Sequence, residues 1–250
     1  MISLCFRHST PRTAVWMPSK MSISTLREQK TVLRKRIQSE LKQLSPQEIQ
    51  RQSAIITQKV LQSPVYKKAT SLAIFLSMPG REVSTREIVL QALKDEKHVY
   101  VPYLHKGQDS KGKIMDMLKL HDRHDFESLV PDAWGIPSLS PDTVLQRSNA
   151  LGGMGVPSED MDDQGNFPTL DVIYMPAVAF DYSRQRLGHG KGFYDRYLHT
   201  YKTCLDAAQP GQKMPFLVGI ALRQQILSPE EKVPVNDDDW PVDEVLTAHE

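Results

Sequence analysis

Cysteine is nearly absent from this chain, whose 250 residues include only Cys5 and Cys204. Two thiols so far apart in sequence provide neither a disulfide framework nor a thiolate metal site, which favours a reducing compartment. No apolar run approaches the roughly 18 residues that a membrane span requires. The net charge is +1, so no strong overall field attracts the protein to nucleic acid or to a membrane. The composition is that of an ordinary globular protein, in which a local basic site could still bind an anion. Separately, we expect a monomer that acts on small molecules.

Acidic residues are missing from the start of the chain, where none occurs before Glu28. Serine and threonine are frequent there, and the basic residues are Arg7, Arg12, Lys20 and Arg27. This composition is typical of mitochondrial transit peptides, and the alternative is a disordered tail with Met21 as a second start. We predict that residues 1–24 are a leader or tail and that the protein is mitochondrial or cytoplasmic, with the leader favouring mitochondria. Residues 25–250 then form a single catalytic domain.

Helical and strand patterns alternate through the first half of that domain. A helix is expected to begin near Thr25, because Thr25 and Glu28 have capping-box spacing. Further helices are expected from Pro46, after Ser84 as a cap, and at 193–205. Strands are expected at 71–77, 98–104, 113–120, 170–176, 215–222 and 242–247. The alternation predicts an α/β sandwich with a mainly parallel, mixed sheet, in which 113–120 is the antiparallel candidate. The Gly- and Asp-rich stretch 151–166 is predicted to be a surface loop.

A glycine-rich segment at 180–195, FDYSRQRLGHGKGFYD, connects a strand to a helix. Gly188, Gly190 and Gly192 let the backbone approach an anion closely and turn amide N–H groups towards it. Arg186 and Lys191 add positive charge, and the following helix contributes its N-terminal dipole. The spacing matches neither a standard P-loop nor a dinucleotide fingerprint. We interpret the segment as a phosphate-binding loop, and the alternative is a flexible turn with incidental basic residues.

Carboxylates near this loop are candidates for binding Mg²⁺. Asp195 lies just past the loop and could hold a Mg²⁺ that bridges phosphate oxygens. The alternative for Asp195 is a first-turn residue stabilised by the helix dipole. The run Asp237–Asp239 is a second candidate, although a triple Asp is usually a solvated turn.

The first helix carries two cations on one face, since Lys30 and Arg34 are four residues apart. They lie beside the apolar stripe of Leu33 and Ile37, so their charged ends can reach from its edge into a cleft. The functional interpretation is a second clamp on a polyphosphate. The alternative is an ordinary solvated helix face.

Several motifs together resemble the 5-formyltetrahydrofolate cyclo-ligase family, also called methenyltetrahydrofolate synthetase. They are Lys30-x-x-Leu33-Arg34, FLSM followed by Glu82, GIP at 135–137, the run MPAVAFDYSRQRLGHGKGFYDRYL at 175–198, and VPVNDDDWPVDEVL near the end. The resemblance covers residues 26–247. It implies a three-layer α/β/α sandwich and ATP-dependent conversion of 5-formyltetrahydrofolate to 5,10-methenyltetrahydrofolate, with ADP and phosphate released. Mg²⁺ is the implied cofactor, and folate polyglutamates are further candidate substrates.

The resemblance also implies roles for individual residues. The implied ATP contacts are Lys30, Thr31, Val32, Leu33, Arg34, Arg186, Leu187, Gly188, His189, Gly190, Lys191, Gly192, Phe193 and Tyr194. The implied folate contacts are Arg34, Leu76, Glu82, His189, Gly190, Lys191, Gly192 and Phe193. Asp195 and Asp239 resemble the metal ligands, and Lys191 and Arg186 are the candidate catalytic cations. Two departures from the family pattern are His189, at a position where Arg or an aromatic is common, and Phe193, which replaces a frequent Tyr.

Phosphoryl transfer to a formyl oxygen needs positioning and charge neutralisation more than a protein nucleophile, which suits this set of residues. Tyr103 and Trp134 are candidate ring-stacking walls, with ordinary core or rim positions as the alternative. Two other functions stay open. One is a phosphosugar isomerase-like or CoA-transferase-like enzyme of related architecture, and the other is a non-catalytic nucleotide-binding protein. A nucleic-acid binder is disfavoured by the balanced charge.

Overall fold

The structure is a computed structural model that describes residues 23–107, 112–156 and 167–249. Nearly all of the predicted leader, and residues 157–166 of the predicted surface loop, lie outside the described residues. The described part of that loop, 151–156, consists of turns and bends with one isolated bridge between Ser148 and Met154.

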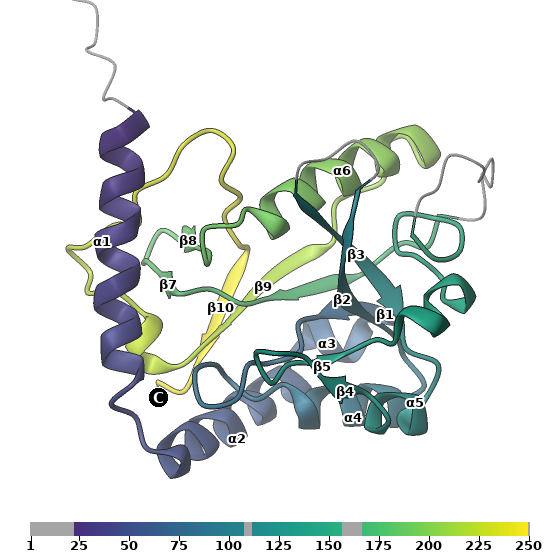
Figure 1. The fold of residues 1–250 in the computed structure, drawn as a ribbon, viewed down its shortest axis with the longest axis horizontal. Coiled ribbons are helices and arrows are strands. Elements are labelled where there is room, and N and C mark those ends of the chain that lie inside the picture. Colours follow the sequence, from purple (N-terminus) through teal and green to yellow (C-terminus); the bar gives the residue numbers. More distant parts are fainter. Residues whose placement is uncertain (1–22, 108–111, 157–166, 250) are drawn as a thin grey trace, which may run out of the picture.

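A six-stranded sheet forms the centre of the molecule, with the strand order β10-β9-β6-β1-β2-β3 (Figure 1). Its strands are β1 (Ser71–Ile74), β2 (His98–Lys106), β3 (Lys113–Lys119), β6 (Val172–Met175), β9 (Phe216–Ala221) and β10 (Glu244–Thr247). All neighbours pair in parallel except β2 and β3, which are antiparallel. Every residue of β1 and β6 is buried, as expected for parallel strands covered on both faces. The predicted mainly parallel, mixed sheet is therefore confirmed.

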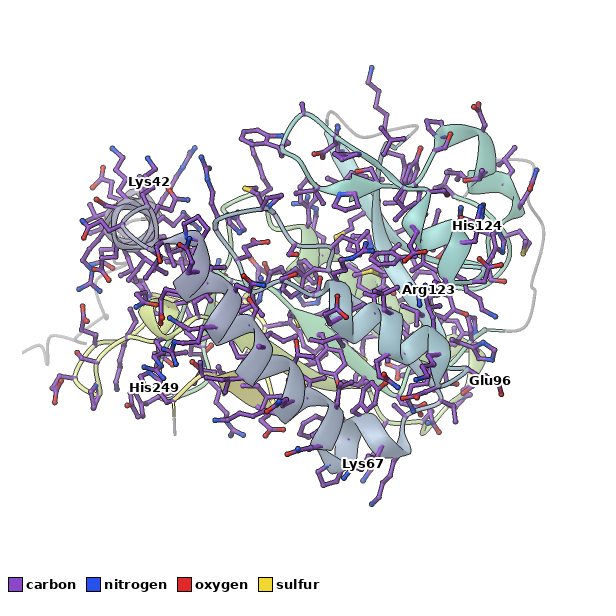
Figure 2. The ribbon with its side chains drawn as sticks, turned by 90° about the horizontal axis from the view of Figure 1, so that it is seen from below. Lys42, Lys67, Glu96, Arg123, His124 and His249 are labelled. Carbon is purple, nitrogen blue, oxygen red and sulfur yellow. The ribbon has the colours of Figure 1, made fainter. Side chains whose placement is uncertain are left out.

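Helices cover both faces of this sheet. They are α1 (Ile23–Leu41), α2 (Pro46–Gln62), α3 (Pro64–Lys68), α4 (Arg86–Lys94), α5 (Arg123–Glu127) and α6 (Phe193–Ala208), with short 3₁₀ turns η1 (Pro141–Gln146) and η2 (Arg223–Gln225). Figure 1 shows α2, α3 and α4 on one side of the sheet and α6 on the other. The first helix stands at one end of the molecule and is seen end-on in Figure 2, where the labelled Lys42 is the residue just after its end. Among the described helices none is long and apolar enough to cross a membrane.

Local capping signals predicted some helix starts and missed others. The Ser45 side chain accepts a hydrogen bond from the Glu48 amide, and Pro46 opens α2 as predicted. The helix expected near Thr25 is confirmed, but α1 begins at Ile23, so Thr25 lies inside the helix and not at its N-cap. The Ser84 prediction is wrong, since α4 begins after Thr85. The Thr85 hydroxyl donates to the Phe75 carbonyl at 2.8 Å instead of capping the helix, so a tertiary contact overrides the local signal.

Other strand ends and several short elements differ from the sequence prediction. The strand expected at 71–77 ends at Ile74, because Phe75 and Leu76 continue as buried irregular backbone. Two small hairpins went unpredicted, namely β4 (Val130–Pro131) with β5 (Pro137–Ser138), and β7 (Ala179–Phe180) with β8 (Arg186–Leu187). The helices α3 and α5 were likewise missed. Each has only five residues, too few to show helical periodicity.

One glycine allows the β7–β8 hairpin to pack against the sheet. A Cβ on Gly219 of β9 would lie 2.5 Å from Cζ of Phe180, whose ring is fully buried. Only hydrogen at this position leaves space for the ring. The hairpin carries Arg186 on its second strand, so this contact positions the start of the glycine-rich loop.

We expect Gly219→Ala to lower the free energy of unfolding by about 1–3 kcal/mol, the usual effect of overpacking a core. Urea denaturation measures the change. Gly112→Ala is the matched control, because a Cβ there meets no heavy atom within 4 Å. Unchanged stability for Gly219→Ala would contradict the close approach of Phe180.

Candidate active site

A cavity of about 590 Å³ opens beside the carboxyl ends of β1, β2 and β6. This edge is where ligands bind in open α/β sheets, because the loops that follow parallel strands meet there. The segment after β1 contributes Met78, Arg81 and Glu82, and the segment after β6 contributes Pro176, Ala177 and Val178. The glycine-rich loop, the start of α6, the end of α1 and Leu104 of β2 also line the cavity, together with Lys113, Gln225 and residues of the 132–136 segment. The cavity is large enough for a drug-sized ligand.

The glycine-rich loop runs from β8 into α6 and touches α1 on the way. The Arg34 side chain donates from Nε to the Gly188 carbonyl at 2.8 Å. A Cβ on Gly190 would lie only 3.2 Å from Cζ of Arg34. Gly190 and Gly192 have φ angles of 91° and 64°, which disfavour residues with a side chain. Gly192 is the residue immediately before α6, so the loop delivers its backbone to the start of that helix.

Two ion pairs join the predicted cations to the predicted metal ligands. Arg186 Nη2 lies 2.6 Å from Asp195 Oδ1, and Lys30 Nζ lies 2.5 Å from Asp239 Oδ2. The amide of Trp240 also donates to Asp195 at 3.3 Å, so the residue next to Asp239 contacts Asp195. The structure thus brings α1, the glycine-rich loop, the start of α6 and the 236–240 segment together.

The carboxylates suit a metal that is shared with a ligand. The described residues contain no cluster of three or more His, Cys, Asp or Glu side chains that could hold an ion alone. Asp195 and Asp239 are two oxygen donors beside a phosphate-sized loop. Mg²⁺ fits such a set, because it is usually bound by one or two carboxylates together with substrate phosphates and water.

Glu82 and His189 form a polar bridge across another part of the cavity. His189 Nε2 lies 3.1 Å from Glu82 Oε1, and Glu82 Oε2 accepts a hydrogen bond from the Met78 amide at 3.0 Å. The Glu82 side chain is only 10% exposed, so its carboxylate is held in place on both oxygens. The apex of the glycine-rich loop is therefore connected to the segment after β1.

Burial shifts the ionisation of two residues at the site. Desolvation lowers the pKa of Arg34, and the nearby charge of Asp239 partly opposes this effect. Burial raises the pKa of the Tyr194 hydroxyl well above its usual value, so this side chain stays neutral. The Arg186 guanidinium lies over the Tyr194 ring, 5.5 Å from its centroid.

Other predicted site residues are not among those that line the cavity, and they include Lys30, Leu33, Arg34, Leu187 and Asp239. Thr31 and Val32 are exposed on α1, and the Thr31 hydroxyl donates to the Arg27 carbonyl. Leu76 is buried in the core at 7% exposure and does not line the cavity. The Tyr103 ring stacks on His105 and is also absent from the lining, whereas Trp134 lines the cavity and is 67% exposed.

Sequence reasoning missed several residues that line the cavity, including Gln38, Lys42, Lys113 and Gln225. A signal existed for the first two, since they continue the four-residue spacing of Lys30 and Arg34 along one face of α1. No local signal pointed to Lys113, which arrives through the antiparallel pairing of β2 and β3.

The model of the 5-formyltetrahydrofolate cyclo-ligase family matches residues 26–248. The chain belongs to this family. A probable 5-formyltetrahydrofolate cyclo-ligase of Caenorhabditis elegans is 30% identical, over 90% of this chain and 95% of the relative. The 5-formyltetrahydrofolate cyclo-ligase of Mus musculus is 31% identical, over 90% of this chain and 97% of the relative. The resemblance read from the sequence motifs is confirmed, and so is the interpretation as an enzyme of this cyclo-ligase family.

Solved structures support the fold of this cyclo-ligase family member. The NMR structure of Aquifex aeolicus 5,10-methenyltetrahydrofolate synthetase has a TM-score of 0.57 and 27% identity, and it covers 88% of this chain and 90% of the other. A 5,10-methenyltetrahydrofolate synthetase from Mycoplasma pneumoniae has a TM-score of 0.54 and 20% identity. The match covers 88% of this chain and 99% of the other. The predicted α/β sandwich is confirmed.

We expect Gly190→Ala to destabilise the protein more than Gly211→Ala does. Both glycines have a similar positive φ, 91° and 87°, so both substitutions introduce backbone strain of about 1–3 kcal/mol. Only at position 190 does the added Cβ also approach Arg34, which its bond to Gly188 holds in place, whereas nothing lies within 4 Å of it at position 211. Urea denaturation of the two variants makes the comparison. Equal losses would mean that the contact between the loop and α1 contributes nothing.

Proposed function

We propose that this protein catalyses the ATP-dependent cyclisation of 5-formyltetrahydrofolate to 5,10-methenyltetrahydrofolate, with release of ADP and phosphate. Family membership supports the reaction class. The observation that carries the proposal is the contact of three separate segments around the glycine-rich loop, which itself lines the cavity: α1 with Lys30 and Arg34, the loop from Arg186 to Gly192, and the 236–240 segment with Asp239. Such an arrangement of cations, backbone amides and carboxylates is suited to a metal–triphosphate.

The chemistry requires activation of a poor leaving group, because the formyl oxygen of an amide does not depart unaided. The formyl oxygen attacks the γ-phosphorus of ATP, a new P–O bond forms, and the bond from that phosphorus to the β–γ bridging oxygen breaks. ADP leaves with that electron pair. N10 of the folate then attacks the activated carbon and loses its proton, and the C–O bond breaks to release phosphate. No external oxidant or reductant is needed.

The residues have separate tasks in this scheme. Lys191 is exposed at the cavity and is available to neutralise charge on the transferred phosphoryl group. Arg186 acts from the base of the loop, and the backbone of residues 188–192 surrounds the phosphates. Asp195 and Asp239 would hold Mg²⁺, which supplies charge neutralisation on the phosphate oxygens when bound. Lys30 and Arg34 position the same phosphates from α1.

The folate is proposed to occupy the part of the cavity that contains Glu82. A fixed carboxylate there accepts hydrogen bonds from the polar edge of a pterin ring, and Trp134 offers an apolar face beside it. We also propose that residues 25–250 act as one catalytic domain and that the protein is a monomer. A mitochondrial or cytoplasmic location stays a proposal, and one relative from Arabidopsis thaliana is described as mitochondrial.

Two alternatives are tested by the same assay. A non-catalytic nucleotide-binding protein would bind ATP but produce no methenyltetrahydrofolate. A phosphosugar isomerase-like enzyme would turn over its substrate without ATP. The cations and carboxylates paired around the loop, next to the cavity that the loop lines, favour the ligase over both, because neither alternative needs a triphosphate held next to a second substrate.

We expect the purified protein to form methenyltetrahydrofolate, measured by its near-ultraviolet absorbance, only when 5-formyltetrahydrofolate, ATP and Mg²⁺ are all present. Removing Mg²⁺ with a chelator should abolish turnover. Lys191→Ala should reduce kcat by roughly 10²- to 10³-fold, the effect of losing one group that stabilises developing charge. Asp195→Asn should also reduce turnover, and it keeps an oxygen available to Arg186.

Lys202→Ala on the exposed side of α6 is the matched control for Lys191→Ala, since Lys202 pairs only with Asp206 among the described residues. It should retain wild-type turnover. Full turnover by a folded Lys191→Ala variant would rule out the assigned role, and product formation without ATP would rule out the reaction.

A further inference from the structure

Strands β2 and β3 continue past the end of β1 as a two-stranded ribbon. The pairing of β1 with β2 ends at Tyr100, whereas the pairing of β2 with β3 runs on to Lys106 and Lys113. We call residues 103–106 and 113–116 the β2–β3 ribbon. It lies beside α6, which packs against β3 (Figure 1). Two strands alone are only marginally stable in water, so the position of such a ribbon depends on its side-chain contacts.

The two faces of the ribbon have different surroundings. Because side chains alternate along a strand, Leu104 and Lys113 lie on one face. Both line the cavity, so this face is part of the cavity wall. His105 and Asp116 lie on the other face. That face is turned towards α6, since the charge of Asp116 acts on the Tyr197 hydroxyl of that helix.

His105 and Asp116 form a hydrogen-bonded pair that joins the two strands diagonally. His105 Nε2 lies 2.7 Å from Asp116 Oδ2, and the residue directly opposite Asp116 is Tyr103. The Asp116 side chain is 2% exposed, so its carboxylate needs partners within the protein. Burial raises the pKa of this carboxyl, and hydrogen bonds from His105 and Asn149 oppose the effect. The Tyr103 ring stacks on the His105 ring and fixes its orientation.

The ribbon and the groups assigned to ATP belong to opposite ends of the sheet. The β7–β8 hairpin, which leads into the glycine-rich loop, packs on β9, and α1 packs on η2 just after β9. In the strand order, β9 is next to one edge of the sheet, whereas β2 and β3 form the other edge. A second substrate that extends from the loop across the cavity therefore meets Leu104 and Lys113. An apolar side chain and an ammonium suit the aromatic ring and carboxylates of 5-formyltetrahydrofolate.

We propose that the His105–Asp116 pair positions the β2–β3 ribbon as the wall that receives 5-formyltetrahydrofolate, so that both are positioning residues for the proposed reaction. The inference rests on the proposed function and goes beyond it, because neither residue lines the cavity. The pair acts through Leu104 and Lys113 on the opposite face. Its loss leaves the backbone ladder of the ribbon but not the side-chain contact that fixes its place. Binding of the folate then weakens, while the groups that hold ATP stay where they are.

The test is His105→Ala, which removes the partner of Asp116. We expect KM for 5-formyltetrahydrofolate to rise by roughly fivefold to tenfold, the scale of one lost hydrogen bond. KM for ATP and kcat at saturating substrates should stay within about twofold of the wild type, because only ground-state binding of the folate is affected. His105→Gln should restore KM, since the amide nitrogen of glutamine can donate to Asp116 in place of Nε2.

General damage to the fold would give a different result. A rise in both KM values, or a loss of kcat at unchanged KM, would overturn the proposal. So would an unchanged KM for the folate in His105→Ala, or a His105→Gln variant no better than His105→Ala.

His98→Ala is the matched control, because His98 is an exposed histidine at the opposite end of β2 from the cavity. It should keep both KM values, and an equal rise in this variant would assign the effect to β2 as a whole and overturn the proposal. His105→Ala leaves a buried carboxylate without this partner and can therefore fail to fold. The double variant His105→Ala/Asp116→Asn removes that charge and should show the same rise in KM for the folate. An unchanged KM there rejects the role of the pair.

Amide hydrogen exchange separates this proposal from the proposed function. In the wild type, 5-formyltetrahydrofolate without ATP should slow exchange at residues 103–106 and 113–116, whereas ATP alone should not. At a folate concentration near the wild-type KM, His105→Ala should show weaker protection of the ribbon. Equal protection in both proteins, or an active wild type whose ribbon the folate does not protect, overturns the role of the pair alone. A wild-type protein that binds neither ligand overturns the proposed function together with it.

Discussion

The ion pair between Arg186 and Asp195 is the contact on which the arrangement of the site depends. The Arg186 side chain is 3% exposed, and a charge so deeply buried requires a partner of opposite sign. Asp195 supplies it from the first turn of α6, and the same carboxylate accepts the amide of Trp240. The residue before Trp240 is Asp239, which binds Lys30 on α1. One buried cation thus links the β7–β8 hairpin, α6, the 236–240 segment and the first helix.

Backbone geometry sets the second constraint, because the glycines of the loop between these charges must bring the main chain close to Arg34 of α1. Arg34 binds the Gly188 carbonyl and lies against Gly190, so the chain has to reverse direction within a few residues of a fixed guanidinium. Positive φ angles at Gly190 and Gly192 provide that path. The alternating glycines therefore serve the packing of the free protein, and the approach of an anion is a consequence of the same open backbone.

Sequence patterns predicted the parts of this fold that depend on neighbours in the chain. Buried apolar runs located the strands, Ser45 and Pro46 located the start of α2, and the glycines located the loop. The predictions were wrong where contacts between segments far apart in the chain determine the local structure. Thr85 bonds to Phe75 instead of capping α4, and Leu76 joins the core instead of the cavity. The pairing of Lys30 with Asp239, 209 residues apart, has no local signature at all. Motif resemblance indicated both residues, but only the fold shows that they meet.

The pairing of cations with carboxylates bears directly on how this site can receive a charged substrate. In the free protein Lys30 neutralises Asp239, and Arg186 neutralises Asp195. Under the proposed function a metal–triphosphate offers each of these four groups a new partner, phosphate oxygens for the cations and a divalent ion for the carboxylates. Each of the four groups then has a partner of opposite charge in both states, so neither state leaves an unpaired ion in a partly buried site.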